Sequence, residues 1–526
     1  IGPPWRSPST DSPLRSSSAD VSGPPSATPG DPPWWMIAVF YQIYPRSFCD
    51  TTGNGIGDLE GIRARLDHLA SLGIDAIWIS PFYPSPMADH GYDVADYCDV
   101  DPMFGSLETF DALLADAHDR GLRVIVDWVP AHTSDQHPWF VASRSSTDNP
   151  KRDWYLWAGD DPDRPPTDWQ ATFPAGPAWT WDDTTSAWYS HTFTPQQPDL
   201  NWSNPEVQEA MLDTLRFWLD RGVDGFRMDV IHHIGRHHGR IADQAESATD
   251  PEHTHRHLQR IRELIDGYDG ARVAVGETWI LDTHEVATYY GHDDELHLCH
   301  NFRPQFAPWA APEWRGEIDA AAAAFDPIGA WPTWLLSNHD IWRMATRYQN
   351  EAIVRCAAVV LLTLRGTPFI YAGDEFGLAD ADVPPEQVED PAGFRDGCRA
   401  PIPWDQGPNH GWQRPDNWLP WPPEADSRNA AAQTGDPASV LELYRRLLML
   451  RRSTPALHRG DQARLELDGD VVGWERTHGG ERRLVLVNFG ASPVDGCLLY
   501  TSPSPRDARK YLVCRLLLEK GGGGGG

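Results

Sequence analysis

Short apolar runs with strong β propensity alternate with helical segments along most of the chain. Residues 59–72 and 107–120 carry apolar side chains at spacings of three and four, which is typical of amphipathic helices. This alternation predicts βα units around a parallel sheet, and we expect eight units that close into a (β/α)8 TIM barrel. The predicted strands are residues 39–44, 74–80, 124–129, 225–230, 273–277, 335–337 and 368–371.

Two segments depart from this alternation. Residues 132–202 are rich in Trp, Asp and Pro and are far longer than an ordinary loop, so we interpret them as a subdomain inserted after the third strand. Near the end, residues 463–488 alternate like antiparallel strands, which predicts a C-terminal antiparallel β domain over residues 456–496. The barrel then comprises residues 34–131 and 203–455.

Both ends of the chain differ from the rest in composition. Residues 1–33 are rich in Pro and Ser and nearly free of large aliphatic side chains, so we expect a disordered leader. Residues 497–526 follow no structural period and end in six glycines. We interpret this stretch as a non-native tail that replaces the last strands of a truncated β domain.

The charge balance restricts the partners of the chain. Asp plus Glu number 76 against 44 Lys plus Arg, which gives a net charge of −32. This charge excludes sustained contact with nucleic acid or anionic lipid, and no apolar run is long enough to span a membrane. Seven scattered cysteines favour a reduced compartment, so we expect a cytoplasmic location. A small ligand is the remaining partner class, and the oligomeric state stays open.

Charged residues stand where several predicted strands end. Asp229, Glu277 and Asp340 follow three different apolar runs, and the carboxyl ends of barrel strands meet at one face. Two carboxyl groups at such a face suit glycosyl transfer, in which one acts as nucleophile and the other as acid. We expect Arg227 to keep Asp229 ionised, and burial to raise the pKa of Glu277.

Five motifs occur in the order found in one enzyme family. They are residues 127–132, 197–201, 225–230, 276–278 and 337–340, and over residues 40–488 the chain resembles glycoside hydrolase family 13, the α-amylase superfamily. Within it, the chain is most similar to the α-glucosidase and oligo-1,6-glucosidase branch. The resemblance implies a retaining mechanism with the reactive carboxyls about 5 to 5.5 Å apart.

The resemblance also assigns roles to residues. It implies Asp229 as nucleophile, Glu277 as acid/base and Asp340 as the third carboxylate, which binds sugar hydroxyls. It further implies that five residues hold the nonreducing glucose, namely Asp93, His132, Arg227, His339 and Arg399.

Two positions bear on activity and specificity. Ala131 stands where the family usually has Asn, which removes an amide beside His132 and weakens the expected activity. Val230, directly after the predicted nucleophile, resembles branch members that accept α-1,6 links, whereas Thr there goes with α-1,4 links. The other interpretation is that Val230 simply continues its strand.

These features predict an exo-acting α-glucosidase that removes terminal glucose from short α-glucosides with α-1,4 and/or α-1,6 links. The alternative within the family is a glucosyl transferase or isomerase of the trehalose synthase or sucrose isomerase type. An alternative from another class is a non-catalytic binding relative, but such relatives lose the active-site carboxylates that this chain retains.

A glycine-rich segment resembles the first part of a calcium loop, and no organic cofactor is expected. It offers oxygen ligands at alternate positions with Gly55 sixth, although Thr52 is a poor ligand and Gly61 stands at position 12. The competing interpretation is a glycine-rich turn that caps the next helix. The candidate calcium ligands are Asp50, Thr52, Asn54, Ile56 and Asp58.

Several histidines cluster in the polar segment after the fourth strand. We expect that segment to be a loop, in which close spacing does not impose a coordination geometry, so no metal site is predicted there. The histidines are His237, His238, His253, His255 and His257.

Overall fold

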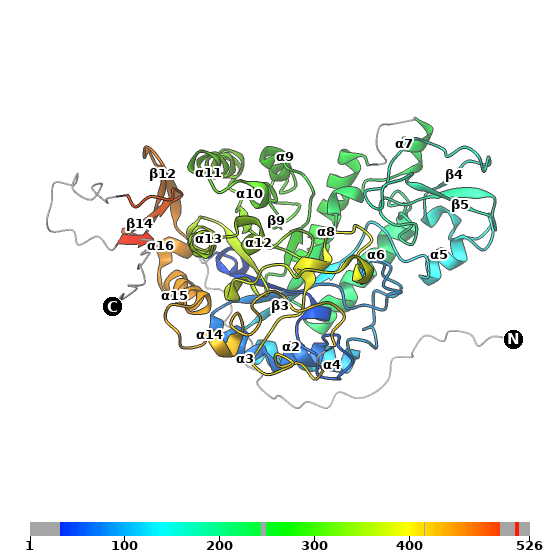
Figure 1. Ribbon diagram of the computed structural model, residues 1–526. Helices are drawn as coiled ribbons and strands as arrows, with labels where there is room; N and C mark the ends of the chain where they lie inside the picture. Colours follow the sequence, from blue (N-terminus) through cyan, green and yellow to red (C-terminus); the bar gives the residue numbers. More distant parts are fainter. Residues whose placement is uncertain (1–31, 244–248, 415, 495–510, 515–526) are drawn as a thin grey trace, which may run out of the picture.

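The computed structural model describes residues 32–243, 249–414, 416–494 and 511–514. Eight parallel strands form its main sheet in the order β10-β11-β1-β2-β3-β7-β8-β9, which confirms the predicted barrel (Figure 1). The strands are β1 Phe40–Ile43, β2 Ala76–Ile79, β3 Arg123–Trp128, β7 Gly225–Met228, β8 Val273–Gly276, β9 Leu298–Cys299, β10 Thr333–Leu335 and β11 Thr367–Tyr371.

The seam of the barrel lies between β9 and β10. The Thr333 hydroxyl donates to the Cys299 carbonyl over 2.7 Å, and the Asn301 amide donates to the same hydroxyl over 3.1 Å. A side chain therefore links the two strands that end the sheet. Strand β9 is not among the strands predicted from the sequence, because a strand of two residues carries no measurable period.

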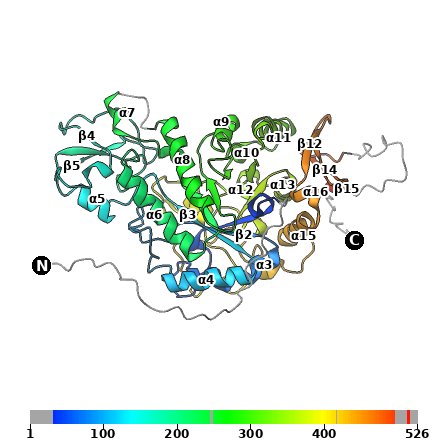
Figure 2. The same cartoon turned by 180° about the vertical axis from the view of Figure 1, so that it is seen from behind.

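Helices surround the strands (Figures 1 and 2). Their apolar faces pack on the outside of the barrel, and caps set their ends; Asn204, for example, accepts from the Glu206 amide at the start of α6, with Pro205 in the first turn. The longer helices are α3 Leu66–Leu72, α4 Leu107–Asp119, α6 Pro205–Arg221, α8 Pro251–Asp266, α11 Ala311–Phe325, α13 Glu351–Thr363 and α15 Val440–Ser453. The shorter ones are α1 Trp34–Ile37, α2 Leu59–Ala64, α5 Pro138–Ser143, α7 His238–Ala242, α9 Thr283–Thr288, α10 Arg303–Phe306, α12 Met344–Tyr348, α14 Ala430–Gln433 and α16 Pro455–His458.

Large apolar side chains fill the interior of the barrel. Phe40 and Phe369 stack with ring centroids 4.7 Å apart, and Trp35 of α1 belongs to the same cluster. Burial of these side chains on adjacent strands makes the barrel a packed core rather than a pore. The other members of the cluster include Trp78, Ile125, Val275, Leu298 and Leu335.

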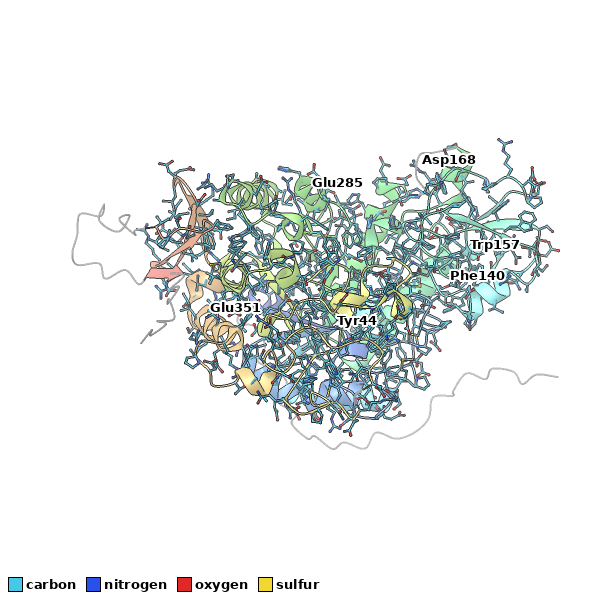
Figure 3. All side chains as sticks on the ribbon, in the orientation of Figure 1. Tyr44, Phe140, Trp157, Asp168, Glu285 and Glu351 are labelled. Carbon is cyan, nitrogen blue, oxygen red and sulfur yellow. The ribbon has the colours of Figure 1, made fainter. Side chains whose placement is uncertain are left out.

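The segment between β3 and α6 folds into a small antiparallel sheet of its own. Its strands are β4 Trp157–Ala158, β5 Trp179–Asp182 and β6 Ala187–Ser190, in the order β4-β6-β5. Phe140 and Trp157 lie together in this part of the chain and stack with centroids 5.6 Å apart (Figure 3). Its core is therefore aromatic, and it is continuous with the apolar layer on the outside of the barrel strands, which includes Val126 and Trp128 of β3.

A second sheet follows α16 at the opposite end of the molecule from the inserted sheet (Figures 1 and 2). Strands β12 Asp461–Leu465, β13 Val471–His478 and β14 Glu481–Asn488 are antiparallel. The antiparallel pairing of these three strands confirms the predicted C-terminal β domain. Strand β15 Tyr511–Cys514, outside the predicted bounds of that domain, adds to the sheet by pairing with β14 in parallel. This strand lies within the stretch interpreted as a non-native tail.

The rest of that tail, and residues 1–31 of the expected leader, lie outside the described residues. Within the described ranges, no helix combines the length and apolar character needed to cross a bilayer.

Candidate active site

The three predicted catalytic carboxylates line one cavity at the carboxyl ends of the strands. Asp229 directly follows β7, Glu277 directly follows β8, and Asp340 lies in the loop after β10. The cavity has a volume of about 1640 Å³, which leaves room for more than one sugar ring. The topology of the barrel thus brings together groups that are far apart in the chain.

Arg227 contacts both reactive carboxyl groups. Its Nη1 donates to Asp127 and to Asp229, both over 2.7 Å, and its Nη2 lies 2.6 Å from Glu277 Oε2. The resemblance had implied that Arg227 holds glucose. Its side chain is instead 1% exposed and does not line the cavity, so it positions the carboxylates. Since one guanidinium contacts both reactive carboxyls, they lie close together, as a retaining mechanism requires.

Burial dominates the ionisation of this pair. It raises the pKa of Asp229 well above its ordinary value, and Arg227 only partly opposes the shift. Arg227 favours the ionised form of Asp229, as expected, but burial and the charges of Glu277 and Asp127 outweigh its effect on the pKa. Burial also raises the pKa of Glu277, as expected. A pair of this kind retains one proton between its two members.

The backbone beside the nucleophile also contacts the acid. The Val230 amide donates to Glu277 Oε2 over 2.9 Å, from a residue with φ 36° and ψ 42°. A β-branched residue rarely adopts this left-handed conformation, so the surrounding structure imposes it. Val230 does not simply continue its strand, which ends at Met228, and its side chain lines the cavity.

Asp340 has a different environment. Burial by itself would raise its pKa, but the net shift is well below the usual range, because His339, Arg395 and Arg399 favour the charged form. Arg395 and Arg399 approach Asp340 Oδ1 at 3.2 and 3.1 Å. Asp340 is therefore held as an anion, which suits a group that binds sugar hydroxyls.

Asp89 occupies the place expected for Asp93. Its Oδ1 lies 2.6 Å from Arg395, its Oδ2 accepts from Gln197 over 3.1 Å, and all three residues line the cavity. Asp93 does not line it: this carboxylate is fully buried and accepts hydrogen bonds from Ser85 and from the Ala88 and Asp89 amides. Asp93 thus shapes the loop that presents Asp89.

His339 and Arg399 also lie behind the cavity lining. Gln42 donates to His339 Nδ1 over 2.7 Å, so Nε2 carries the proton and faces Asp340 Oδ2 at 3.2 Å. Arg399 donates to the His339 carbonyl as well as to Asp340. Both residues position Asp340, and Arg395 takes the cavity-lining place expected for Arg399.

His132 is the one predicted glucose-binding residue that lines the cavity. Its Nε2 lies 3.0 Å from the Tyr92 carbonyl, and its Nδ1 has no hydrogen-bond partner within the described part of the chain. Burial lowers the pKa of His132 to about 4, so the ring is neutral near pH 7. The Nδ1 atom is itself buried, and Nε2 also lies 3.1 Å from Gln197 Nε2, another residue of the cavity lining. Ala131, the neighbour of His132, packs with Phe193 and Val230 in a small apolar cluster.

Aromatic side chains form the outer part of the lining. Trp342 is 56% exposed, Phe394 54% and Phe306 51%, so large apolar surfaces face solvent near the catalytic groups. Trp279 stacks on Phe302 with centroids 4.5 Å apart, which fixes its ring. Faces of this kind pack against the apolar side of a sugar ring. These aromatic residues could not be predicted from the sequence, because they come from separate segments without a shared motif.

The candidate calcium loop is closed by its own backbone. Asp50 Oδ1 accepts from the Gly53 amide over 2.7 Å and Oδ2 from the Gly55 amide over 3.0 Å. Asp58 caps α2 by accepting from the Gly61 amide over 2.6 Å, which matches the competing interpretation of a capping turn. Asp50 Oδ1 also accepts from the Thr52 amide, and both oxygens of Asp58 accept from Thr51, so Asp50 Oδ2 is the one of these four oxygens with a single donor within the described residues. Calcium at this loop stays a prediction.

The fold and the site define a barrel enzyme of the α-amylase type. Residues 42–460 match the family model of the α-amylase catalytic domain, and the chain belongs to this family. A probable α-glucosidase of Rhizobium meliloti (strain 1021) is 44% identical over 498 residues, which cover 87% of this chain and 90% of that protein.

Two further relatives are similar over the same extent. An oligo-1,6-glucosidase of Parageobacillus thermoglucosidasius is 34% identical over 511 residues and covers 87% of this chain and 90% of its own. The crystal structure of the trehalulose synthase MutB from Pseudomonas mesoacidophila MX-45 superposes with a TM-score of 0.82 at 36% identity. It covers 88% of this chain and 92% of that one.

Proposed function

We propose that this protein is a retaining, exo-acting α-glucosidase that removes terminal glucose from short α-glucosides with α-1,4 and/or α-1,6 links. The observation that carries the proposal is that Arg227 joins Asp229 and Glu277 at one wall of the cavity, beside the ionised Asp340. The ion pair of Asp89 and Arg395 supports a terminal sugar, because it presents charged partners for several hydroxyls of one ring.

The arrangement suits a double displacement. Asp229 attacks the anomeric carbon while Glu277 protonates the departing oxygen, which breaks the glycosidic bond and leaves a covalent glucosyl ester. Glu277, now ionised, then removes a proton from water, and the water oxygen displaces Asp229. The released glucose retains the α configuration. Arg227 remains bonded to both carboxyls and stabilises whichever of them is charged at each step.

The proposal is tested by two substitutions and the configuration of the product. Asp229→Ala and Glu277→Gln should each lower the kcat for maltose by several orders of magnitude while leaving the thermal unfolding cooperative. The control is Asp168→Ala, an exposed position in the inserted subdomain, which should leave kcat unchanged. Proton NMR during early turnover should show α-glucose first. Undiminished activity of Asp229→Ala, or β-glucose as first product, would contradict the proposal.

The second candidate is a glucosyl transferase or isomerase, favoured by the similarity to a trehalulose synthase. It differs in which nucleophile releases the glucosyl ester, a sugar hydroxyl or water. Incubation with sucrose distinguishes the two activities. Hydrolysis yields free glucose and free fructose in equal amounts, whereas isomerisation yields a new disaccharide and little of either monosaccharide. A non-catalytic binding relative is the least supported reading, and turnover of any α-glucoside would exclude it.

A further inference from the structure

Three side chains outside the cavity converge near the loop that follows the nucleophile. His253 does not lie in a loop, as the sequence analysis expected, but in the first turn of α8. Asp250 begins this helix: its Oδ1 accepts from the amides of Glu252 and His253 over 3.0 and 3.4 Å. His237 stands directly before α7 and packs against His253, with ring centroids 4.4 Å apart.

The backbone holds these side chains together without help from a ligand. Arg236 and Thr249, the neighbours of His237 and Asp250, form an antiparallel bridge. The Asp250 amide donates to the Gly235 carbonyl over 3.2 Å. At Gly235 a Cβ would lie 2.1 Å from the Asp250 carbonyl oxygen, so glycine is required for the close approach.

We propose that His237, Asp250 and His253 bind a divalent transition-metal ion such as Zn²⁺. Their ligand atoms all lie within 4.8 Å of one another, and His237 Nε2 is 3.4 Å from Asp250 Oδ2. Tetrahedral zinc with ordinary bond lengths sets its ligand atoms roughly 3.4 Å apart, so the third atom needs only a small side-chain rotation. Two imidazoles and a carboxylate are ligands that zinc prefers.

The two carboxylate oxygens of Asp250 have different partners, which supports this assignment. Oδ1 caps the helix, which leaves Oδ2 to face the histidines. The His237 and Asp250 side chains are 18% and 27% exposed, so an ion can enter from solvent.

The other histidines of the region have different partners. His255 Nδ1 lies 2.7 Å from Glu295 Oε2, and His257 packs on Trp202 at 5.3 Å between centroids. His238 lies near Asp153 and Asn201. They are therefore not part of the cluster, and His255 offers a matched control.

The ion would act on structure rather than on the reaction. None of its three ligands lines the cavity, but His232 and His233 of the same segment do. A metal at His237 would therefore fasten the end of the cavity-lining segment to α8. Three protein ligands leave one coordination position for water.

Metal titration of the full chain, stripped with EDTA and dialysed, tests the proposal. We expect calorimetry with Zn²⁺ to give a single equivalent and a higher Tm, and Co²⁺ to give the visible absorption of tetrahedral imidazole coordination. His253→Gln and Asp250→Asn should each weaken binding by at least roughly tenfold, as even outer partners of a metal site do. Asn remains a good helix cap, so Asp250→Asn should fold normally.

His255→Gln should bind Zn²⁺ as tightly as the wild type. Equal affinity in the wild type, His253→Gln and Asp250→Asn would overturn the proposal, and so would a wild type without stoichiometric binding. Circular dichroism and cooperative thermal unfolding, measured alongside, confirm that each variant is folded and keep this test separate from that of the proposed function.

Discussion

The Val230 amide donates to the Glu277 carboxylate over 2.9 Å, so the residue after the nucleophile also holds the acid. Val230 can do this only in its left-handed conformation, with φ 36°. One short turn after β7 therefore places the Asp229 carboxylate, the Val230 amide and the Val230 side chain at the same wall of the cavity. A single backbone conformation thus sets both the contact to Glu277 and the position of the Val230 side chain.

The Val230 side chain should influence linkage preference. Val230→Thr keeps the branched shape and the amide bond to Glu277 but adds a hydroxyl to the cavity wall. We expect the ratio of kcat/KM for isomaltose to that for maltose to fall roughly tenfold or more, within the range of a single group in a pocket. The pH profile for maltose, which depends on Glu277, should not move. An unchanged ratio would remove the specificity role.

Arg395 and Arg399 should differ in their kinetic effects. Arg395 lines the cavity and contacts Asp89, Asp340 and Asp390, an arrangement that a single ammonium group cannot reproduce. Arg395→Lys should lower kcat/KM by roughly 10- to 100-fold, mainly through KM, as expected for lost charged hydrogen bonds. Arg399→Lys, which reaches substrate only through Asp340, should lower kcat with less effect on KM. The reverse pattern would contradict the placement of the two residues.

The acid limb of the pH–rate profile should depend on Asp127. Burial raises the pKa of Asp229 first of all, and the charges of Glu277 and Asp127 raise it further. Activity therefore falls with decreasing pH at a higher pH than for an ordinary carboxyl. Asp127→Asn removes one of these charges and leaves Arg227 with fewer partners, so the acid limb of kcat/KM should move to lower pH. Glu60→Gln, an exposed change on α2, should leave the limb unchanged.

Asp93 should make stability dependent on pH. Burial raises the pKa of Asp93 to about 6, above its value in the unfolded chain. Protonated Asp93 therefore contributes to the free energy of unfolding. This contribution is fully present below the pKa of Asp93 in the unfolded chain and is lost as the pH rises to about 6. This loss amounts to about 3 kcal/mol. Denaturant unfolding should therefore show a flatter decline of stability between pH 4 and 6 for Asp93→Asn than for the wild type. Parallel curves would show that Asp93 titrates normally.

Removal of calcium tests the loop at Asp50. If the loop binds calcium as predicted, EGTA should lower the Tm by several degrees and added Ca²⁺, but not Zn²⁺, should restore it. Asn54→Ala should abolish the response, because it removes one oxygen ligand while the Asp58 cap remains. A Tm that does not respond to EGTA or Ca²⁺ would leave the loop as a capping turn only.

Some predictions from the sequence failed for a local reason. Asp89 and Asp93 are carboxylates of one short loop, as Arg395 and Arg399 are guanidinium groups of another, and composition cannot tell which one faces a cavity. In each pair the structure selects one for the cavity, and the other supports the loop or Asp340. The segment around His253 was expected to be a loop, although Asp250 and Pro251 are a good helix start.

The sequence by itself determined the barrel and the positions of Asp229, Glu277 and Asp340, because apolar periodicity and the polar residues that end strands are local signals. Only the tertiary structure decided that one guanidinium holds both reactive carboxyls, that Asp89 and Arg395 face the cavity, and that His237 meets His253. Ionisation also belongs to this second group, since the pKa of a carboxyl depends on burial and on charges brought near it by folding.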